Sequence, residues 1–265
     1  MIPRNIAQAV VGENGLFAHS DGFQDDWRPE VERVIEVFSL PRGSHAPSCL
    51  FATPFARRHV AVVSLSGRRF RFLILGRPLW DVIPDPFTIV DRFSPKSDGP
   101  LPDLEWPPEP LPKRTVAQLD GVFKHGDGPF LLGACQTLVD GGRIAIRRGE
   151  PDPALCRDVW NLLPDSTRRQ CWPATFAYST ALGFSLVVLP EVPAGGLPGY
   201  LSEDQTRDYP ESRYERELQT AVEAGDQRTV DRLFARRTSV ETLRLAIWIT
   251  MGAAVLAVAS RILMQ

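Results

Sequence analysis

The sequence lacks the short patterns that mark the common catalytic and metal-binding sites. It has no GxxxxGK[ST] segment, which excludes a P-loop nucleotide hydrolase, and no GxSxG segment typical of serine hydrolases. Its 4 histidines are scattered and form neither HxH nor HExxH, so no grouped set of zinc ligands is expected. We therefore predict no metal, no cofactor and no familiar catalytic motif.

Cysteine and net charge are also scarce. The 4 cysteines form no CxxC pair, so we expect reduced, partly buried thiols and neither a disulfide framework nor a zinc site. A formal net charge of −2 provides no basic surface for nucleic acid, which we exclude as a partner. Residues 1–14 contain no long apolar core or cleavage-like site, so no signal peptide is expected.

One long apolar run stands out near the C-terminus, because residues 245–260 are apolar on every helical face. A helix rises about 1.5 Å per residue and a hydrocarbon core is about 30 Å thick, so residues 245–260 span about 24 Å, a little short, and an extension past Arg261 to Met264 gives about 30 Å. The predicted anchor covers residues 241–264. Arg244 and Trp248 would then lie at one membrane interface and Arg261 at the other. We predict a membrane anchor. A buried core helix is the alternative, although such a helix normally keeps a polar stripe.

The charges beside this run predict its orientation. Several arginines precede it and one follows it, so the positive-inside rule places the N-terminal body in the cytoplasm. We expect a single-pass, tail-anchored protein of the cytoplasmic (inner) membrane with the lipid bilayer as a partner. The small residues of the run, such as Gly252 and Ala257, leave open a homo-oligomer formed through the helix.

The body upstream of the run alternates strand and helix signals. We predict an α+β fold with mixed or antiparallel sheets and packed helices, followed by a helical hairpin and a single C-terminal transmembrane helix. Strands are expected at residues 6–11, 15–20, 49–52, 59–65, 70–75, 143–146, 174–178 and 184–189, and helices at 25–38, 115–124, 130–139 and 153–163.

Proline- and glycine-rich stretches suggest the domain boundaries. Whether the two α+β halves share one sheet or form two domains is left open by the sequence. The predicted parts are an N-terminal α+β half (1–93), a proline-rich connector (94–113), a second α+β half (114–190), a linker (191–210), a helical hairpin stalk (211–238) and the transmembrane anchor (241–264).

Several short motifs resemble one known family over about residues 5–190. They are Gly12-Glu13, Ala18-His-Ser20, Asp85-Pro86-Phe87, Asp140-Gly-Gly-Arg143, Trp160-Asn-Leu-Leu-Pro164, Arg168, Pro173-Ala-Thr-Phe-Ala177 and Phe184-Ser-Leu-Val. The chain resembles the N-terminal domain of the bacterial GTPase-associated protein family. The resemblance implies a regulatory or scaffolding component that works with small GTPases, and it implies no catalytic residues.

Arginine is the polar residue that gathers most around the apolar elements of the second half. These side chains form a candidate site for a phosphate, a nucleotide or an acidic partner segment. A solvated face, or ion pairing with nearby carboxylates, is the simpler alternative. The candidate binding residues are Arg143, Arg147, Arg148, Arg168 and Arg169.

We therefore predict a membrane-tethered, non-catalytic adaptor or regulator of a bacterial GTPase-linked signalling or conflict system. Two alternatives stay open: a membrane-anchored enzyme with a site around His19, Asp140 and Arg143, and an oligomerising structural membrane protein. A pocket that gathers these three residues would favour the enzyme, whereas an exposed apolar patch without such a pocket would favour the adaptor.

Overall fold

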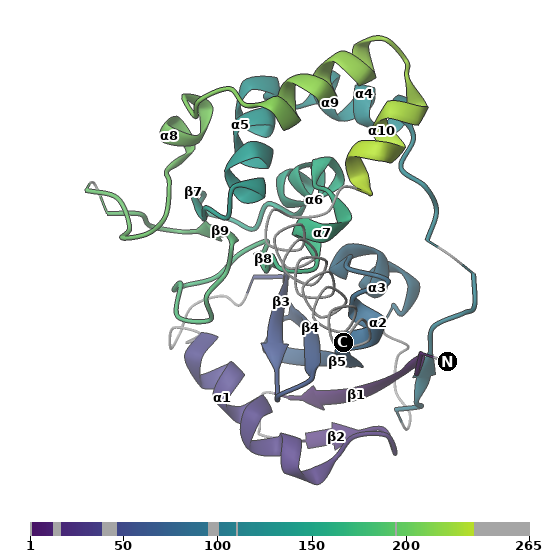
Figure 1. Cartoon of the computed structure of the whole chain (residues 1–265). Helices are drawn as coiled ribbons and strands as arrows, with labels where there is room; N and C mark the ends of the chain where they lie inside the picture. The colour runs from purple at the N-terminus through teal and green to yellow at the C-terminus, as the bar shows by residue number, and fades with distance from the viewer. Residues whose placement is uncertain are drawn as a thin grey trace, which may run out of the picture.

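One mixed β-sheet runs through both halves of the body in the computed structural model (Figure 1). The structure describes residues 2–12, 17–38, 47–94, 101–109, 111–193 and 195–235. In this part of the chain the strand order is β2-β1-β5-β4-β3-β8-β9-β7, with β6 beside β1. The strands are β1 (Asn5–Val11), β2 (Phe17–His19), β3 (Cys49–Phe55), β4 (His59–Ser66), β5 (Arg69–Gly76), β6 (Leu104–Glu105), β7 (Ile144–Arg147), β8 (Pro173–Ala174) and β9 (Leu186–Leu189).

The two halves meet where β3 pairs with β8. Phe51 lies opposite Ala174 in this antiparallel contact. Two hydrogen bonds add to it: the main-chain N–H of Thr175 donates to the carbonyl oxygen of Leu50, and the main-chain N–H of Leu50 donates to Oγ1 of Thr175. The strands of the first half pair antiparallel, whereas β9 pairs in parallel with both β7 and β8. The question that the sequence leaves open is thus answered: both halves contribute to one sheet.

Helices cover the two faces of the first half separately. The 3-10 turn η1 (Asp25–Trp27) leads into α1 (Arg28–Phe38), whose buried Val31, Val34 and Phe38 follow helical spacing and face the sheet. The ring of Phe38 stacks on Phe51 at 5.0 Å between centroids. The opposite face is covered by α2 (Arg77–Trp80) and α3 (Pro86–Arg92), and Trp80 and Ile89 of these helices pack with side chains of the sheet in a second core.

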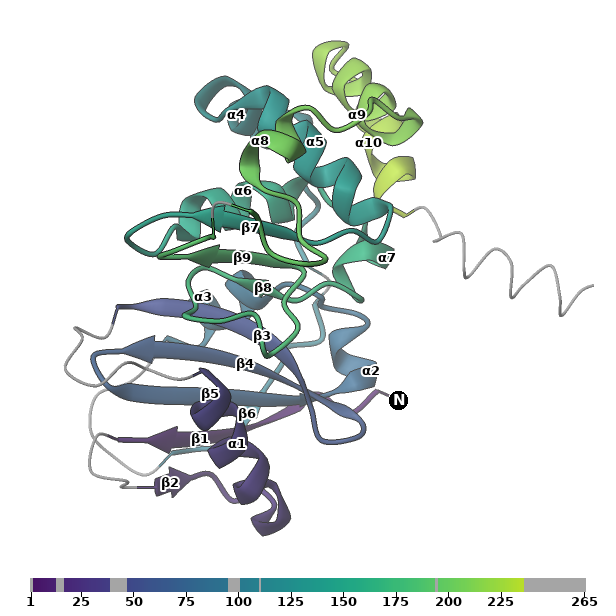
Figure 2. The same cartoon turned by 90° about the vertical axis from the view of Figure 1, so that its left-hand side faces the viewer.

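The other helices gather at the β7 end of the sheet, as Figure 2 shows. They are α4 (Val116–His125), α5 (Gly128–Val139), α6 (Pro153–Leu162), α7 (Asp165–Arg168), α8 (Glu203–Arg207), α9 (Arg213–Glu223) and α10 (Gln227–Phe234). The α9–α10 hairpin turns at Gly225, which has a φ of 68°, and it packs through Leu218 and Leu233 into the main hydrophobic core. It is therefore a docked part of the body.

A buried arginine attaches the connector to the sheet. Arg71 on β5 donates from Nη2 and Nε to the Oε1 atom of Gln8, at 2.7 and 3.2 Å, and from Nη1 to the carbonyl oxygen of Phe93. Gln8 in turn donates to the carbonyl oxygen of Pro102 at 2.6 Å. Burial lowers the pKa of Arg71. These bonds link the end of α3 and the connector to the neighbouring strands β1 and β5.

Two sequence predictions need correction. Residues 174–178 were predicted as a full strand, but β8 covers only Pro173–Ala174; it pairs in parallel with β9, the strand predicted at 184–189. All four residues of β9 are buried, and a continuous apolar run of this kind carries no information about strand direction.

The predicted fold class is wrong in its membrane-spanning part. In the part of the chain that the structure describes, no helix has the length and apolarity needed to cross a membrane. The described fold is an α+β mixed sheet with packed helices. The stretch 241–264, with Arg244, Trp248 and Arg261, lies outside the described residues. A cytoplasmic-membrane location and a bilayer partner stay predictions from the sequence.

Candidate functional site

A groove opens where the C-terminal end of α6 meets α3, α10 and the end of the connector, and we call it the α6 groove. Its volume is about 660 Å³, which lies within the usual range for ligand sites. Val82 lies in its wall with 54% of its surface exposed, one of two large hydrophobic residues that are exposed in the described structure. The polar lining residues used below are Asp85, Lys113, Arg114, Asn161, Asp165, Arg168 and Asp231.

Asp85 is held in the groove by its role at the start of α3. Its Oδ1 atom accepts hydrogen bonds from the main-chain N–H groups of Phe87 and Thr88, both at 3.1 Å, and Pro86 occupies the first helical turn. The other carboxylate oxygen, Oδ2, lies 3.5 Å from Nη1 of Arg168. One side chain therefore caps a helix and contacts a buried cation.

Arg168 lies at the end of α7 and is only 3% exposed. Its Nε donates to the carbonyl oxygen of Trp160 at 2.8 Å, and its Nη2 donates to Oδ1 of Asn161 at 3.4 Å. Burial lowers the pKa of Arg168, and the carboxylate of Asp85 opposes that shift. The guanidinium is thus fixed by packing on one side and faces the groove on the other.

Arg114, the residue that directly follows the connector, reaches the same helix end. Its Nη1 donates to the carbonyl oxygens of Asn161, at 3.0 Å, and Leu163, at 2.5 Å. Its Nη2 donates to Oδ1 of Asp165 at 2.5 Å, and its Cζ lies 3.6 Å from the centre of the Phe234 ring. Burial, and then the charge of Arg168, lower the pKa of Arg114 to about 9. The side chain stays protonated at neutral pH.

The end of α6 explains why two cations gather in the protein interior. The last carbonyl groups of a helix have no partners within it and form the negative end of its dipole. Arg168 and Arg114 donate hydrogen bonds to several of these carbonyl oxygens. The hydroxyl of Tyr214 donates to another one, the carbonyl oxygen of Leu162, at 2.7 Å. Capping of α6 is therefore one role of both arginines.

The charged side chains of the α6 groove are paired with one another. Its cations and carboxylates balance: Lys113 pairs with Asp231 at 3.0 Å, and Arg114 pairs with Asp165 at 2.5 Å. Its described lining contains no histidine, cysteine or serine. Across the described residues, no group of three or more potential ligands is placed to hold a metal ion.

The five arginines that were predicted to form one binding site lie in different parts of the structure. Arg168 lines the α6 groove, and the carbonyl oxygen of its neighbour Arg169 accepts hydrogen bonds from Arg77 and Trp80, at 2.8 and 3.2 Å. Arg148 is half-buried and pairs with a carboxylate of α8, with its Nη1 atom 2.6 Å from Oε2 of Glu203.

Arg143 and Arg147 lie at opposite ends of β7 and are both exposed. The guanidinium of Arg143 lies 5.8 Å from the ring centre of Tyr200, and Arg147 lines a hollow of about 530 Å³ together with Tyr178. Of the five, Arg168 is the one that the structure places in the α6 groove.

The residues of the enzyme alternative lie far apart in the sheet order. His19 belongs to β2 at one edge, whereas Arg143 directly precedes β7 at the other edge. Asp140 caps the end of α5 and accepts hydrogen bonds from the side chains of Gln136, at 2.9 Å, and Tyr209, at 3.2 Å. No single pocket can gather the three.

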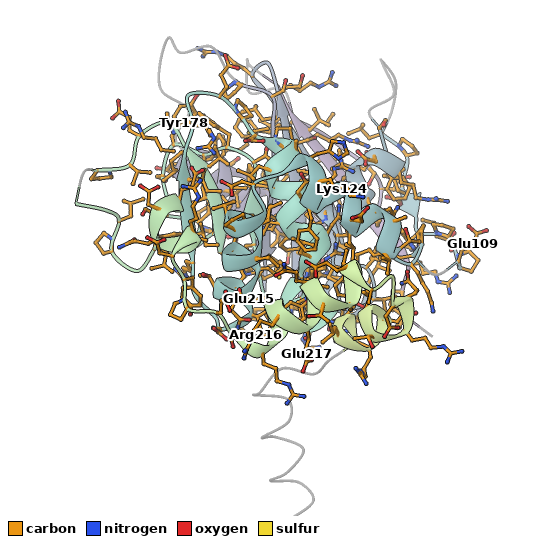
Figure 3. All side chains as sticks on the ribbon, turned by 90° about the horizontal axis from the view of Figure 1, so that it is seen from above. Glu109, Lys124, Tyr178, Glu215, Arg216 and Glu217 are labelled. Atoms are coloured by element: carbon orange, nitrogen blue, oxygen red, sulfur yellow. The ribbon has the colours of Figure 1, made fainter. Side chains whose placement is uncertain are left out.

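A second charged hollow of about 500 Å³ lies between α4, α5, α8 and α9. Figure 3 looks onto these helices and labels Lys124, Glu215 and Arg216, which line it. Lys124 pairs with Asp120 on its own helix at 2.6 Å, and both side chains are largely exposed. Exposed pairs of this kind contribute little to stability or specificity, so the α6 groove is the better candidate.

Sequence reasoning missed Lys113, Arg114 and Asp85 as site residues. Lys113 ends the connector and Arg114 directly follows it, where no periodic pattern marks them. Asp85 entered the sequence analysis only as part of the motif Asp85-Pro86-Phe87. Comparison with family models, with curated proteins and with solved structures finds no match for this chain. The family resemblance stays a prediction.

Proposed function

We propose that this chain is a non-catalytic adaptor or regulator in a bacterial GTPase-linked signalling or conflict system, and that the α6 groove is where it binds its partner, a small GTPase. The observation that carries the proposal is the groove itself, where an exposed apolar side chain, Val82, lies beside fixed buried charges. Such a combination of apolar wall and well-placed polar groups is typical of binding sites.

The separation of His19 from Arg143 supports a binding role over the enzyme alternative, because reacting groups must lie within hydrogen-bond reach of one another or of one substrate. The exposed apolar surface is narrow: among the described residues only Ile2 and Val82 are large, hydrophobic and exposed, at 43% and 54%. The proposed contact is therefore a groove contact and not a broad apolar face.

The proposal is tested by measuring binding of the full chain to a small GTPase encoded beside it, loaded with GDP or with a non-hydrolysable GTP analogue. Val82→Asp adds a charge to the wall of the groove, and a buried interface contact of this kind is typically worth a tenfold change in affinity or more. Ile2→Asp makes the same change at the other exposed hydrophobic residue and should leave binding unaltered.

Two results would overturn the proposal. One is the absence of binding in both nucleotide states. The other is binding that Val82→Asp leaves at wild-type strength, which would place the contact elsewhere on the molecule.

A further inference from the structure

The hollow of about 530 Å³ that Arg147 lines lies at the carboxyl ends of the parallel strands, and we call it the β9 hollow. Arg147 ends β7 and lies opposite Leu189, the last residue of β9. On the other side of β9 the main-chain N–H of Ala177 donates to the carbonyl oxygen of Val188 at 2.9 Å, which brings Tyr178 to the same level. In open α/β sheets, ligands bind outside the carboxyl ends of the parallel strands. The β9 hollow therefore has a position suited to a ligand.

Two opposite charges line the β9 hollow without pairing. Arg147 and Glu191 are both exposed. In the part of the chain that the structure describes, neither side chain forms an ion pair or a hydrogen bond. The α6 groove differs, because its cations have carboxylate partners. A ligand that carries both an anionic and a cationic group would form an ion pair with each of the two side chains at once.

The ring of Tyr178, labelled in Figure 3, is held in place at the same hollow. It packs edge to face against Phe38 and Phe176, with 6.1 and 5.4 Å between the ring centroids. Its hydroxyl forms no hydrogen bond with the described residues. A phenol hydroxyl can donate to a carboxylate, and the packing of the ring fixes where this one lies. Tyr178 is thus a second donor for an anionic group.

The rest of the hollow offers an apolar wall. Leu189 is buried, and Val192 and Leu197 are half-buried and pack against the main core. An apolar body on the ligand would cover these side chains, whereas a bare ion would leave them in water. The volume of the hollow lies within the usual range for small-molecule sites.

We infer that the β9 hollow binds a small zwitterion with an apolar body, the chemistry of an apolar α-amino acid. Its carboxylate accepts from Arg147 and Tyr178, and its ammonium group pairs with Glu191. Its apolar part lies against the wall that includes Leu189. The planar fork of arginine matches a carboxylate with two parallel donors. The hollow shares no lining residue with the α6 groove, so binding here is independent of the proposed function.

The experiment is calorimetric titration of the full chain with L-leucine at neutral pH and constant ionic strength. Saturable binding at one site with a dissociation constant of about 1 mM or lower is expected. Isocaproate lacks the ammonium group of leucine and isopentylamine lacks its carboxylate, so each should bind about five-fold more weakly or worse. Glycine lacks the apolar body and should also bind more weakly.

Substitutions at the two charges make the test specific. Arg147→Gln and Glu191→Gln each remove one charge, and each should weaken leucine binding about five-fold or more because one ion pair is lost. Tyr178→Phe keeps the packing of the ring and should weaken binding by a smaller factor. Arg143→Gln removes an exposed arginine at the other end of β7 and is the matched control, which should bind leucine as the wild type does.

Absence of saturable leucine binding overturns the inference, and so does binding of isocaproate or isopentylamine that is as strong as that of leucine. Leucine binding that neither charge substitution alters would place the site elsewhere and overturns it as well. Thermal unfolding of each variant confirms that the fold is intact. Because Arg147 and Glu191 are exposed, their variants should unfold as the wild type does.

Discussion

Arg168 donates from Nε to the carbonyl oxygen of Trp160 at 2.8 Å, with the arginine only 3% exposed. Arg168→Met should therefore lose the cap of α6 and leave Asp85 beside the groove without its cation. Removing one partner of a buried ion pair typically costs about 3–5 kcal/mol of unfolding free energy. Urea unfolding measures the loss.

The control for this variant is Arg147→Met, because Arg147 is an exposed arginine with no buried carboxylate beside it. It should change the free energy of unfolding by no more than about 0.5 kcal/mol. Equal effects of the two substitutions would contradict a capping role for Arg168.

Gly133 lies where α5 and α8 are in close backbone contact. A Cβ atom added there would lie 2.0 Å from the main-chain oxygen of Thr206, which is backbone and cannot turn aside. Gly133→Ala should destabilise the protein by about 1–3 kcal/mol or more, because overpacking forces backbone shifts.

Gly121 provides the matched comparison, since it lies within α4 and an added Cβ would meet no atom within 4 Å. Alanine is the better helix former by about 1 kcal/mol, so Gly121→Ala should raise the unfolding free energy by up to that amount. Thermal unfolding of both variants measures the effects. The same sign for both would show that helix propensity decides and that the α5–α8 contact does not.

Local elements of this fold could be predicted where one pattern dominates. The compact, valine-rich apolar run at 59–65 predicted the strand that is observed as β4, and Asp152 with Pro153 predicted the start of α6. A turn at Gly225 predicted the break between two helices, which the structure places at α9 and α10. Each of these signals lies within a few neighbouring residues.

The α6 groove depends on contacts between distant segments, and this is why the sequence does not reveal it. Arg114 follows the connector, Arg168 ends a short helix and Asp85 caps α3, and the fold brings these three distant residues to the end of α6. Arg168 entered the predicted binding set as one of several arginines. Its burial and its contacts with α6 are properties of the topology.

The four cysteines should be chemically inert in the folded protein. All are free and buried, and burial raises the pKa of Cys49 to about 12 and that of Cys171 to about 11. Because the thiolate is the reactive form, iodoacetamide at pH 8 should label none of them under native conditions. After unfolding in guanidinium chloride all four should react, as counted by intact-mass spectrometry. Native labelling of Cys171 would show that its side of the core opens readily.

The packing of α10 should weaken in acid before that of the main core. Hydrogen bonds from the side chains of Thr229 to Asp226, and of Gln227 and then Lys113 to Asp231, lower the pKa of both carboxyl groups below the ordinary 3.8. A carboxyl group with a lowered folded-state pKa stabilises the fold above its unfolded value, and this contribution is lost as the pH falls through the folded-state pKa. Hydrogen-exchange protection of α10 should therefore drop below pH 3.8, earlier than that of α5. Asp226→Asn still caps the helix but does not titrate, so it should flatten part of this dependence; an unchanged pH profile would assign the loss to other groups.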